Sequence, residues 1–177
     1  MSRRVTFVQD QKNFGLDVKY VYDGDKLLGT GGAIKHALFH LTDHFFVLYG
    51  DSWLEVDYRQ TWKEFVSQGK AALMTVYRNE SKWDTSNVEM NGREIKQYSK
   101  QIHNENMTHI DYGLSILTKK VFDDYSFYKD FDLSDIFETL AVKGDLGSFE
   151  VRERFYEIGS EKGLRELEEV IVQKVSQ

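Results

Sequence analysis

Glycines and acids stand at two positions where proteins often hold small anions. Gly29, Gly31 and Gly32 precede an apolar helical pattern in the segment LLGTGGAIKHAL. Glycines before a helix let the backbone approach a ligand closely and direct N–H groups at it. Asp51 directly follows the apolar run HFFVLYG, where a carboxylate can hold Mg²⁺ together with substrate phosphates. Together these features predict a site for a phosphate-bearing molecule, although each alone is weak.

The two common phosphate-loop patterns are absent from this stretch. GTGGAIKH does not match GxGxxG, and the sequence contains no GxxxxGK[ST]. A bland interpretation therefore stays open, in which the glycines only form a tight loop and Asp51 only caps one. The position of Asp51 after a buried strand still favours function, since ligands of open α/β folds bind outside the carboxyl ends of the strands.

The first half of the chain alternates between strand and helix patterns. The predicted elements are a strand over 17–23, a helix over 32–41, a strand over 44–51 that is buried on both faces, a helix over 58–70 that Gly69 ends, and a strand over 71–78. This order predicts an α/β fold with a doubly wound, mostly parallel, Rossmann-like sheet.

The second half adds an antiparallel insertion. Residues 86–100 alternate on both sides of Asn91-Gly92, which predicts a hairpin with a type I′ turn. Further elements follow in order: a strand over 109–117, a helix over 132–144 with Asp132 and Asp135 as favourable N-terminal acids, two short strands within 147–160, and a final helix that Ser160 caps. No linker or repeat divides the chain, so residues 1–177 are expected to form one domain.

Composition excludes several classes of protein. The formal charge is −6 and the pI about 5.4 with dispersed lysines and arginines, so no basic face offers itself to nucleic acid. The sequence has no cysteine, which excludes disulfide scaffolds and thiolate metal sites. It also shows no apolar run of membrane-spanning length and no leader pattern, so a cytoplasmic location without membrane contact is expected.

Five segments, in their order and spacing, resemble the sugar-1-phosphate nucleotidyltransferases, also called NDP-sugar pyrophosphorylases. The segments are LLGTGGAIKHAL, FFVLYGDSWLEVD, SNVEMNGREIKQYSK, HIDYGLSIL and FYEIGSEKGLREL. The resemblance covers nearly the whole chain and is strongest to guanylyltransferases that act on heptose or mannose 1-phosphate. It implies that the substrates are an NTP and a sugar 1-phosphate and that the cofactor is Mg²⁺.

The resemblance also implies roles for the nucleotide and the metal. Gly29, Thr30 and Gly31 would contact the nucleobase, and Asp51 would bind the Mg²⁺ that bridges the phosphates. Glu157 would be the second metal ligand, although many members have Asp there. This departure lengthens the side chain by one methylene group. Without the resemblance, Glu157 could be an ordinary acid at a strand end.

Three further residues are assigned to the sugar phosphate by the same resemblance. Asn87 would touch the sugar, and Gly113 would let the backbone approach it. Lys100, in the segment YSK, would pair with the sugar phosphate and so join Asp51 and Glu157 as a catalytic residue. Without the resemblance, Lys100 could be a solvated residue after the hairpin.

The N-terminus departs from the family pattern. Family members begin with a strand and a GxGTRL-type loop that cradles the NTP phosphates, and this sequence contains neither. Residues 1–14 instead resemble the helix and turn before the family's third strand, so the domain is expected to be N-terminally truncated by roughly two βα units of about 30 residues each. A homo-oligomer or a separate N-terminal piece would then cover the exposed strand edges.

Two function classes follow. The first is a nucleotidyltransferase that forms an NDP-sugar, in particular a GDP-sugar, and pyrophosphate once the missing part completes it. The second is a catalytically inactive family remnant that binds a sugar phosphate, a nucleotide or a partner subunit. Little or no transferase activity is expected from this chain alone.

Overall fold

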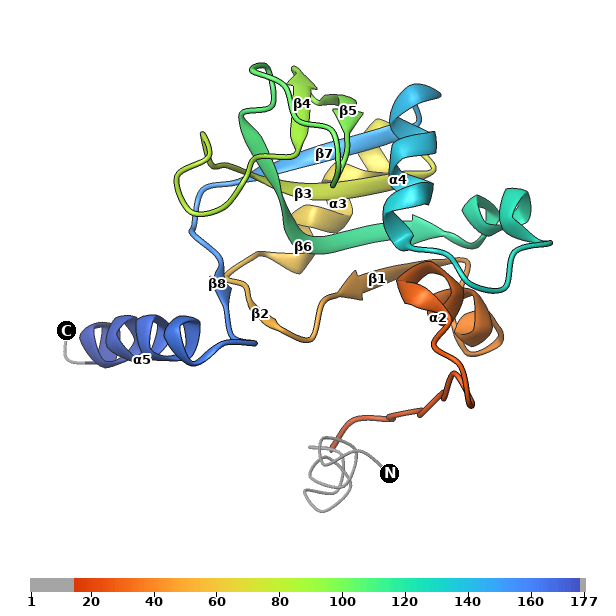
Figure 1. Cartoon of the computed structure of the whole chain (residues 1–177), viewed down its shortest axis with the longest axis horizontal. Helices are drawn as coiled ribbons and strands as arrows, with labels where there is room; N and C mark the ends of the chain where they lie inside the picture. Colours follow the sequence, from red (N-terminus) through yellow and green to blue (C-terminus); the bar gives the residue numbers. More distant parts are fainter. Residues whose placement is uncertain (1–14, 176–177) are drawn as a thin grey trace.

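A computed structural model describes residues 15–175, and Figure 1 shows a mixed sheet with helices on both faces. The larger sheet contains, in spatial order, β1 (His44–Leu48), β6 (His109–Thr118), β3 (Ala72–Arg78), β7 (Leu146–Val151), β5 (Glu94–Tyr98) and β4 (Val88–Asn91). A second sheet pairs β2 (Ser52–Trp53) with β8 (Tyr156–Glu157). The helices are α2 (Gly29–Ala37), α3 (Tyr58–Gln68), α4 (Leu133–Val142) and α5 (Glu161–Val175), with the 3₁₀ segments η2 (Leu38–His40) and η3 (Lys119–Tyr125).

The predicted α/β class is confirmed, and the pairing of the strands is more mixed than predicted. β1, β3 and β7 run in the same direction, but β6 lies antiparallel between β1 and β3. The pair β3–β7 is parallel, whereas β5 pairs with β7 in the antiparallel direction. β4 and β5 form the predicted antiparallel hairpin. The parallel direction therefore holds for β1, β3 and β7, and the chain runs from the carboxyl ends of β1 and β7 to Asp51 and Glu157.

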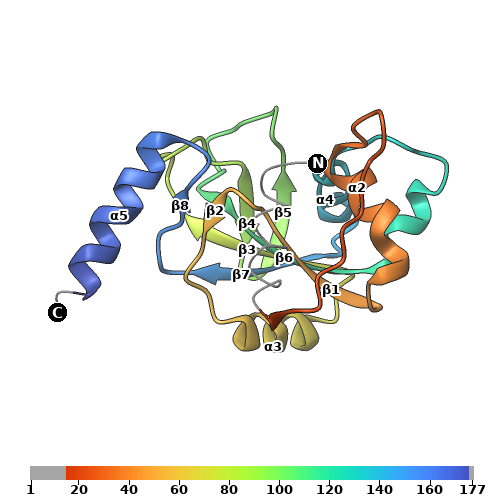
Figure 2. The same ribbon diagram turned by 90° about the horizontal axis from the view of Figure 1, so that it is seen from below.

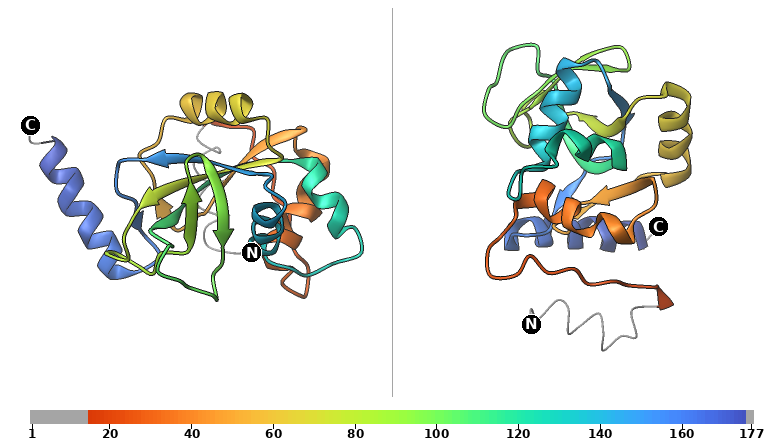
Figure 3. Two further views of the ribbon diagram at one scale, coloured as in Figure 1. Left: turned by 90° about the horizontal axis from the view of Figure 1, so that it is seen from above. Right: turned by 90° about the vertical axis from the view of Figure 1, so that its right-hand side faces the viewer.

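The helices cover the two faces of the sheet unequally. Figure 2 and Figure 3 show α3 on one face and α4 on the other, with α2 beside α4. Helix α5 follows β8 and projects away from the larger sheet (Figure 1).

Within residues 15–175, no helix is long and apolar enough to cross a membrane.

The core lies on both sides of β3, whose side chains alternate between the two faces. Met74 and Val76 join the cluster that packs under Phe137 of α4. Leu73 points the other way and packs with Phe65 of α3. A central strand covered on both faces explains the continuous apolar run in the sequence of β3.

The prediction that the strand over 44–51 is buried on both faces is wrong. Phe45 is 8% exposed, whereas Phe46 is 39% and Leu48 is 49% exposed. The reason is that β1 has one described neighbour in the sheet, β6, and its second face is covered only in part by α3. An apolar run does not distinguish a central strand from such an edge strand.

Two local predictions are also corrected. Residues 17–23 form no strand, because no described strand pairs with them. The central residues of the hairpin turn are Gly92 and Arg93, since Asn91 pairs with Glu94. Of the two, Gly92 has a positive φ of 61°, so the turn is not type I′, which needs positive φ at both positions.

The helix boundary predictions fared better. Gly69 ends α3 in the left-handed conformation, with φ of 60°. Asp132 and Asp135 form a reciprocal capping box at the start of α4. The Ser160 hydroxyl accepts a hydrogen bond from the Gly163 N–H at 3.1 Å, which confirms its capping role. The predicted helix and turn over 1–14 lie outside the described residues.

Candidate functional site

The two predicted metal ligands lie next to each other. Asp51 follows β1, and β2 then pairs with β8 so that Ser52 stands opposite Glu157. The N–H of Ile158 donates to the carbonyl oxygen of Asp51 at 2.7 Å. Both acidic residues are exposed. The short β2–β8 ladder thus brings together two acids that are distant in the sequence.

Glycines after Glu157 make room for this pair. At Gly159, a Cβ would overlap the Glu157 carboxylate and lie 3.4 Å from the Cβ of Asp51. At Gly163, a Cβ would overlap the carbonyl oxygen of Glu157. The Ser160 hydroxyl meanwhile donates to Glu157 Oε2 at 2.6 Å. Gly163 was not predicted from the sequence, although a glycine in the first turn of a helix is itself a signal of close approach.

The chemistry of this pair suits Mg²⁺. No group of three or more His, Cys, Asp or Glu side chains that could hold a metal occurs among residues 15–175. Mg²⁺ does not need such a cage, because it keeps several waters and usually takes one or two carboxylates together with substrate phosphates. Two exposed carboxylates at a strand end therefore fit a metal that is completed by its substrate.

Gly113 and Asn87 lie around the middle of β6. Gly113 has φ of +99°, and its carbonyl oxygen accepts the Tyr49 N–H at 3.2 Å. A Cβ at Gly113 would lie in van der Waals contact with Ser52 Oγ and Tyr49 Cδ2, each 3.6 Å away. The Asn87 side-chain oxygen accepts the Asp111 N–H at 3.0 Å. Gly113 is thus beside the residues that lead from β1 to Asp51, and Asn87 holds the backbone two residues before Gly113.

Asp111 is a half-buried acid that was not predicted as a site residue from the sequence. Its Oδ1 accepts the Gly113 N–H at 3.0 Å. Burial raises the pKa of the Asp111 carboxyl to about 6, against the opposing effects of that N–H group and of Lys100. Burial and the nearby Asp111 also raise the pKa values of Tyr49 and Tyr98, whose hydroxyls are buried without a hydrogen-bond partner among the described residues.

The raised pKa of Asp111 predicts a pH dependence of stability. The folded chain holds this proton to higher pH than the unfolded chain, so stability falls from about pH 4 to about pH 6 and is constant above. The full loss is about 3 kcal/mol for this one group. Asp111→Asn keeps an oxygen for the Gly113 N–H and cannot ionise. We expect urea unfolding across this range to show a flatter pH profile for the variant, and an unchanged slope would contradict the burial of this charge.

Lys100 and Thr30 meet at Asp132. The Lys100 ammonium lies 3.2 Å from Asp132 Oδ1, and the Thr30 hydroxyl donates to the same oxygen at 3.0 Å. Burial alone would raise the pKa of Asp132, but the Ser134 N–H and Lys100 lower it to about 2. The prediction for Asp132 as a helix acid therefore holds, and the structure adds a link between the glycine segment and Lys100.

The glycine segment packs against the start of α4. The N–H groups of Gly31 and Gly32 both donate to the Phe131 carbonyl oxygen at 3.1 Å. A Cβ at Gly29 would overlap the same oxygen, and one at Gly31 would overlap the Phe131 ring. These two N–H groups are therefore engaged within the chain. Gly29 and Thr30 are exposed, whereas Gly31 is buried.

The charges of this region decide what it can bind. Lys100 lowers the pKa of Asp111, and Asp111, Asp132 and Asp51 all raise the pKa of Tyr49. These three acids therefore all lie near Tyr49. With Glu157 they outnumber the single lysine. These acids would repel a polyphosphate, and a divalent cation would offset that repulsion.

Comparison with known proteins gives the following relatives. No family model matches the chain. A D-glycero-α-D-manno-heptose 1-phosphate guanylyltransferase from Campylobacter jejuni is 27% identical over 125 residues, which are 70% of this chain and 54% of that protein. The chain thus spans about half the length of this curated relative.

Solved structures share the fold. A structure of a glucose-1-phosphate thymidylyltransferase from Bacillus anthracis, described as putative and in complex with sucrose, superposes with a TM-score of 0.78 at 20% identity and covers 94% of this chain and 70% of that one. HddC from Yersinia pseudotuberculosis, in complex with GMP-PN, gives a TM-score of 0.67 at 20% identity, with coverage of 94% and 74%. At this identity the likeness establishes the fold alone.

Proposed function

The chain resembles the sugar-1-phosphate nucleotidyltransferase family in sequence and fold. We propose that it carries a site that joins an NTP to a sugar 1-phosphate. The products would be an NDP-sugar and pyrophosphate. One observation carries the proposal, namely the β2–β8 ladder that places Asp51 beside Glu157 at the end of β1. The curated guanylyltransferase relative favours a GDP-sugar among the possible products.

Catalysis of this reaction requires mainly that the two substrates are positioned and that their negative charge is neutralised. An oxygen of the sugar phosphate attacks the α-phosphorus of the NTP, that new P–O bond forms, and the bond to pyrophosphate breaks. Asp51 and Glu157 would hold Mg²⁺, which supplies positive charge to the phosphates when bound. Lys100 would leave Asp132, to which it is bound at 3.2 Å, and pair with the sugar phosphate. Holding two anions in line is the larger part of such catalysis.

The three residues proposed for the nucleobase differ in what they can offer. Gly31 is buried and its N–H is engaged with Phe131. Gly29 and Thr30 are exposed, so the base is proposed to lie against their backbone. Gly31 then serves the same site by keeping α2 close to α4. Asn87 and Gly113 are proposed to face the sugar from β6 and the residues before β4.

A second candidate function is binding without turnover. The sequence contains no GxGTRL segment for the triphosphate, and β1 leaves Phe46 and Leu48 exposed along its edge. Such an edge can accept a further strand, from a second copy or from a separate chain. In this case the chain would bind a nucleotide or sugar phosphate, and a partner would complete or replace the catalytic function.

Calorimetry of the purified chain tests whether it binds either substrate, and release of pyrophosphate from GTP and mannose 1-phosphate separates turnover from binding alone. We expect GDP-mannose and GTP to bind with Mg²⁺ and to bind much more weakly without it. Association of the chain with a second copy should appear as a larger mass in light scattering. Lys100→Gln should weaken sugar-phosphate binding by roughly tenfold, because a charge-assisted hydrogen bond is lost. Lys96→Gln is the matched control, since Lys96 is also exposed and paired, with Glu94 at 2.7 Å. No binding of any nucleotide or NDP-sugar would reject the first candidate.

A further inference from the structure

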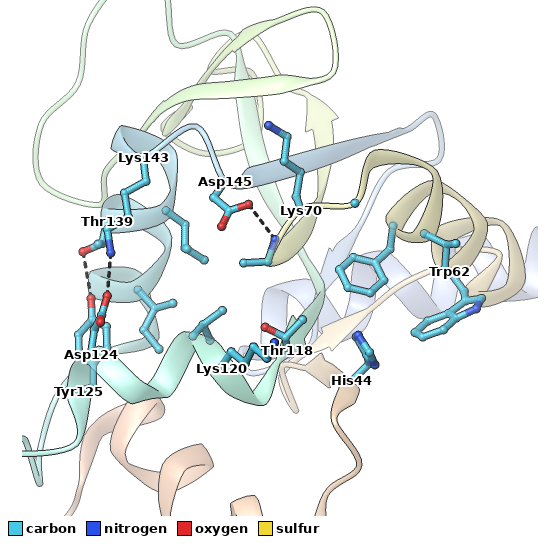
Figure 4. Close-up of a pocket in the computed structure, with 17 residues that line it drawn as sticks. His44, Trp62, Lys70, Thr118, Lys120, Asp124, Tyr125, Thr139, Lys143 and Asp145 are labelled. Atoms are coloured by element: carbon cyan, nitrogen blue, oxygen red, sulfur yellow. Dashed lines mark hydrogen bonds and ion pairs between the residues drawn. The ribbon is translucent and has the colours of Figure 1, made fainter.

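A cavity of about 700 Å³ lies away from the residues discussed so far. Figure 4 shows it between α3, η3 and α4, at the starts of β3 and β7. His44 at the start of β1 lines it, whereas Asp51 follows the other end of β1. The five residues of β1 span roughly 16 Å. The cavity and the candidate phosphate site therefore lie at opposite ends of the parallel strands.

One side of the cavity is aromatic. His44 packs edge-on against Trp62 and Phe65, with ring centroids 5.9 Å and 5.6 Å apart. Trp62 and Phe65 are themselves 5.5 Å apart. Leu140 and Ile136 of α4 line the cavity from the other side. A volume of this size and two apolar walls suit a small molecule with a flat apolar body.

The charged groups of the cavity favour an anion. Three lysines and two aspartates line it. Lys143 binds Asp124 at 2.7 Å, and Asp145 accepts the Ala71 N–H at 3.0 Å. Lys70 donates to the carbonyl oxygen of Gly144 at 2.5 Å. Lys120 forms no ion pair with any residue from 15 to 175. Its charge is therefore available to a ligand.

An unpartnered hydroxyl points to the same ligand. Thr118 Oγ1 is buried without a hydrogen-bond partner among the described residues, and Thr118 lines the cavity. Buried polar atoms nearly always have partners, so one that lacks them calls for an explanation. Figure 4 places Thr118 beside Lys120, between the aromatic side and α4. A bound oxyanion would accept a hydrogen bond from Lys120, and one from Thr118 once rotation about χ1 turns its hydroxyl into the cavity.

We propose that this cavity is a second ligand site, which takes an organic anion with a flat apolar body. Its carboxylate or phosphate lies against Lys120 and Thr118, and its apolar body lies against Trp62, Phe65 and Leu140. The site depends on neither Asp51 nor Lys100. It is therefore independent of the proposed nucleotidyl transfer, and failure of one proposal leaves the other in place.

Paired probes of one shape test the proposal. In ¹⁵N NMR, 2-naphthoate and 2-naphthyl phosphate should shift the indole resonance of Trp62, assigned with Trp62→Phe, and leave those of Trp53 and Trp83 in place. Neutral 2-naphthamide should bind roughly tenfold more weakly. The tighter of the two anions identifies the preferred oxyanion. Equal affinity for the amide, or displacement of the probe by GTP with Mg²⁺, would overturn the proposal.

Two variants locate the anionic group. Lys120→Gln should weaken 2-naphthoate binding roughly fivefold to tenfold, whereas Lys162→Gln should not, since Lys162 lies on α5 away from the cavity. Thr118→Val should weaken binding several-fold, as expected for a lost hydrogen bond. It should not lower resistance to urea, because the hydroxyl bonds to nothing described in the chain. Unchanged affinity in both cavity variants would show that the anion lies elsewhere.

Discussion

Replacing Gly29 with alanine is expected to lower the free energy of unfolding by about 3 kcal/mol, as the sum of two costs that the structure separates. The first cost is conformational, since Gly29 has φ of +73°, and a left-handed L-residue costs about 1–2 kcal/mol. The second is steric, because the new Cβ overlaps the carbonyl oxygen of Phe131. That backbone cannot move away without breaking the bonds from Gly31 and Gly32.

Gly24→Ala is the matched control for this experiment. Gly24 also has positive φ, at +88°, but a Cβ there meets nothing within 4 Å. It should therefore show the conformational cost alone, about 1–2 kcal/mol. The difference between the two variants in urea unfolding measures the contact with Phe131. Equal losses would mean that the glycine segment does not pack on Phe131 as described.

The same pair of variants bears on function. A loss of nucleotide binding in Gly29→Ala could arise in two ways: the new side chain could displace α2, or it could occupy the space of the nucleobase. If Gly29→Ala retains its fold at low temperature and still fails to bind, the exposed backbone of Gly29 and Thr30 is implicated. The packing of Gly31 on Phe131 shows why glycine patterns alone are ambiguous. A glycine can serve close approach to the chain itself as well as to a ligand.

Local chemistry made much of the fold predictable. The end of α3 at Gly69, the acids at the start of α4 and the cap at Ser160 each depend on a few adjacent residues. The hairpin was predictable from its alternation, but its turn was shifted by one residue because the Asn-Gly pattern does not fix the register. Residues 17–23, which form no strand, show the limit of such patterns, since a strand also needs a neighbour.

The candidate site was less predictable because it is built from distant parts of the chain. Thr30 reaches Asp132 over 102 residues, and Lys100 reaches it over 32. Asp111 stands in a strand pattern, and its burial depends on side chains from several other elements. Asp51 and Glu157 were paired by family resemblance rather than by spacing. No local pattern could predict that these two acids lie side by side. The β2–β8 ladder that brings them together contains only two residues in each strand.

Asp51→Asn should reduce the Mg²⁺-dependent affinity for GTP by about a hundredfold or more, since even indirect partners of a metal ligand are worth 10–100-fold. Asp51 is exposed, and its one recorded side-chain contact is a 3.4 Å hydrogen bond from Ser52. Asparagine retains an oxygen for that bond. We therefore expect the free energy of unfolding to change by less than about 0.5 kcal/mol, so a loss of binding would report on the metal rather than the fold.

Variants of Glu157 complete this test. Glu157→Gln should lose metal-dependent binding as well, whereas Glu157→Asp restores the side-chain length that many family members have and should retain it. Glu153→Gln is the control, because it removes the same charge from the exposed segment between β7 and β8. Calorimetry of GTP binding across a Mg²⁺ titration distinguishes the four variants. Unchanged affinity in Asp51→Asn would remove Asp51 from the mechanism, and loss of binding in Glu153→Gln would mean that net charge, rather than coordination by Asp51 and Glu157, governs the affinity.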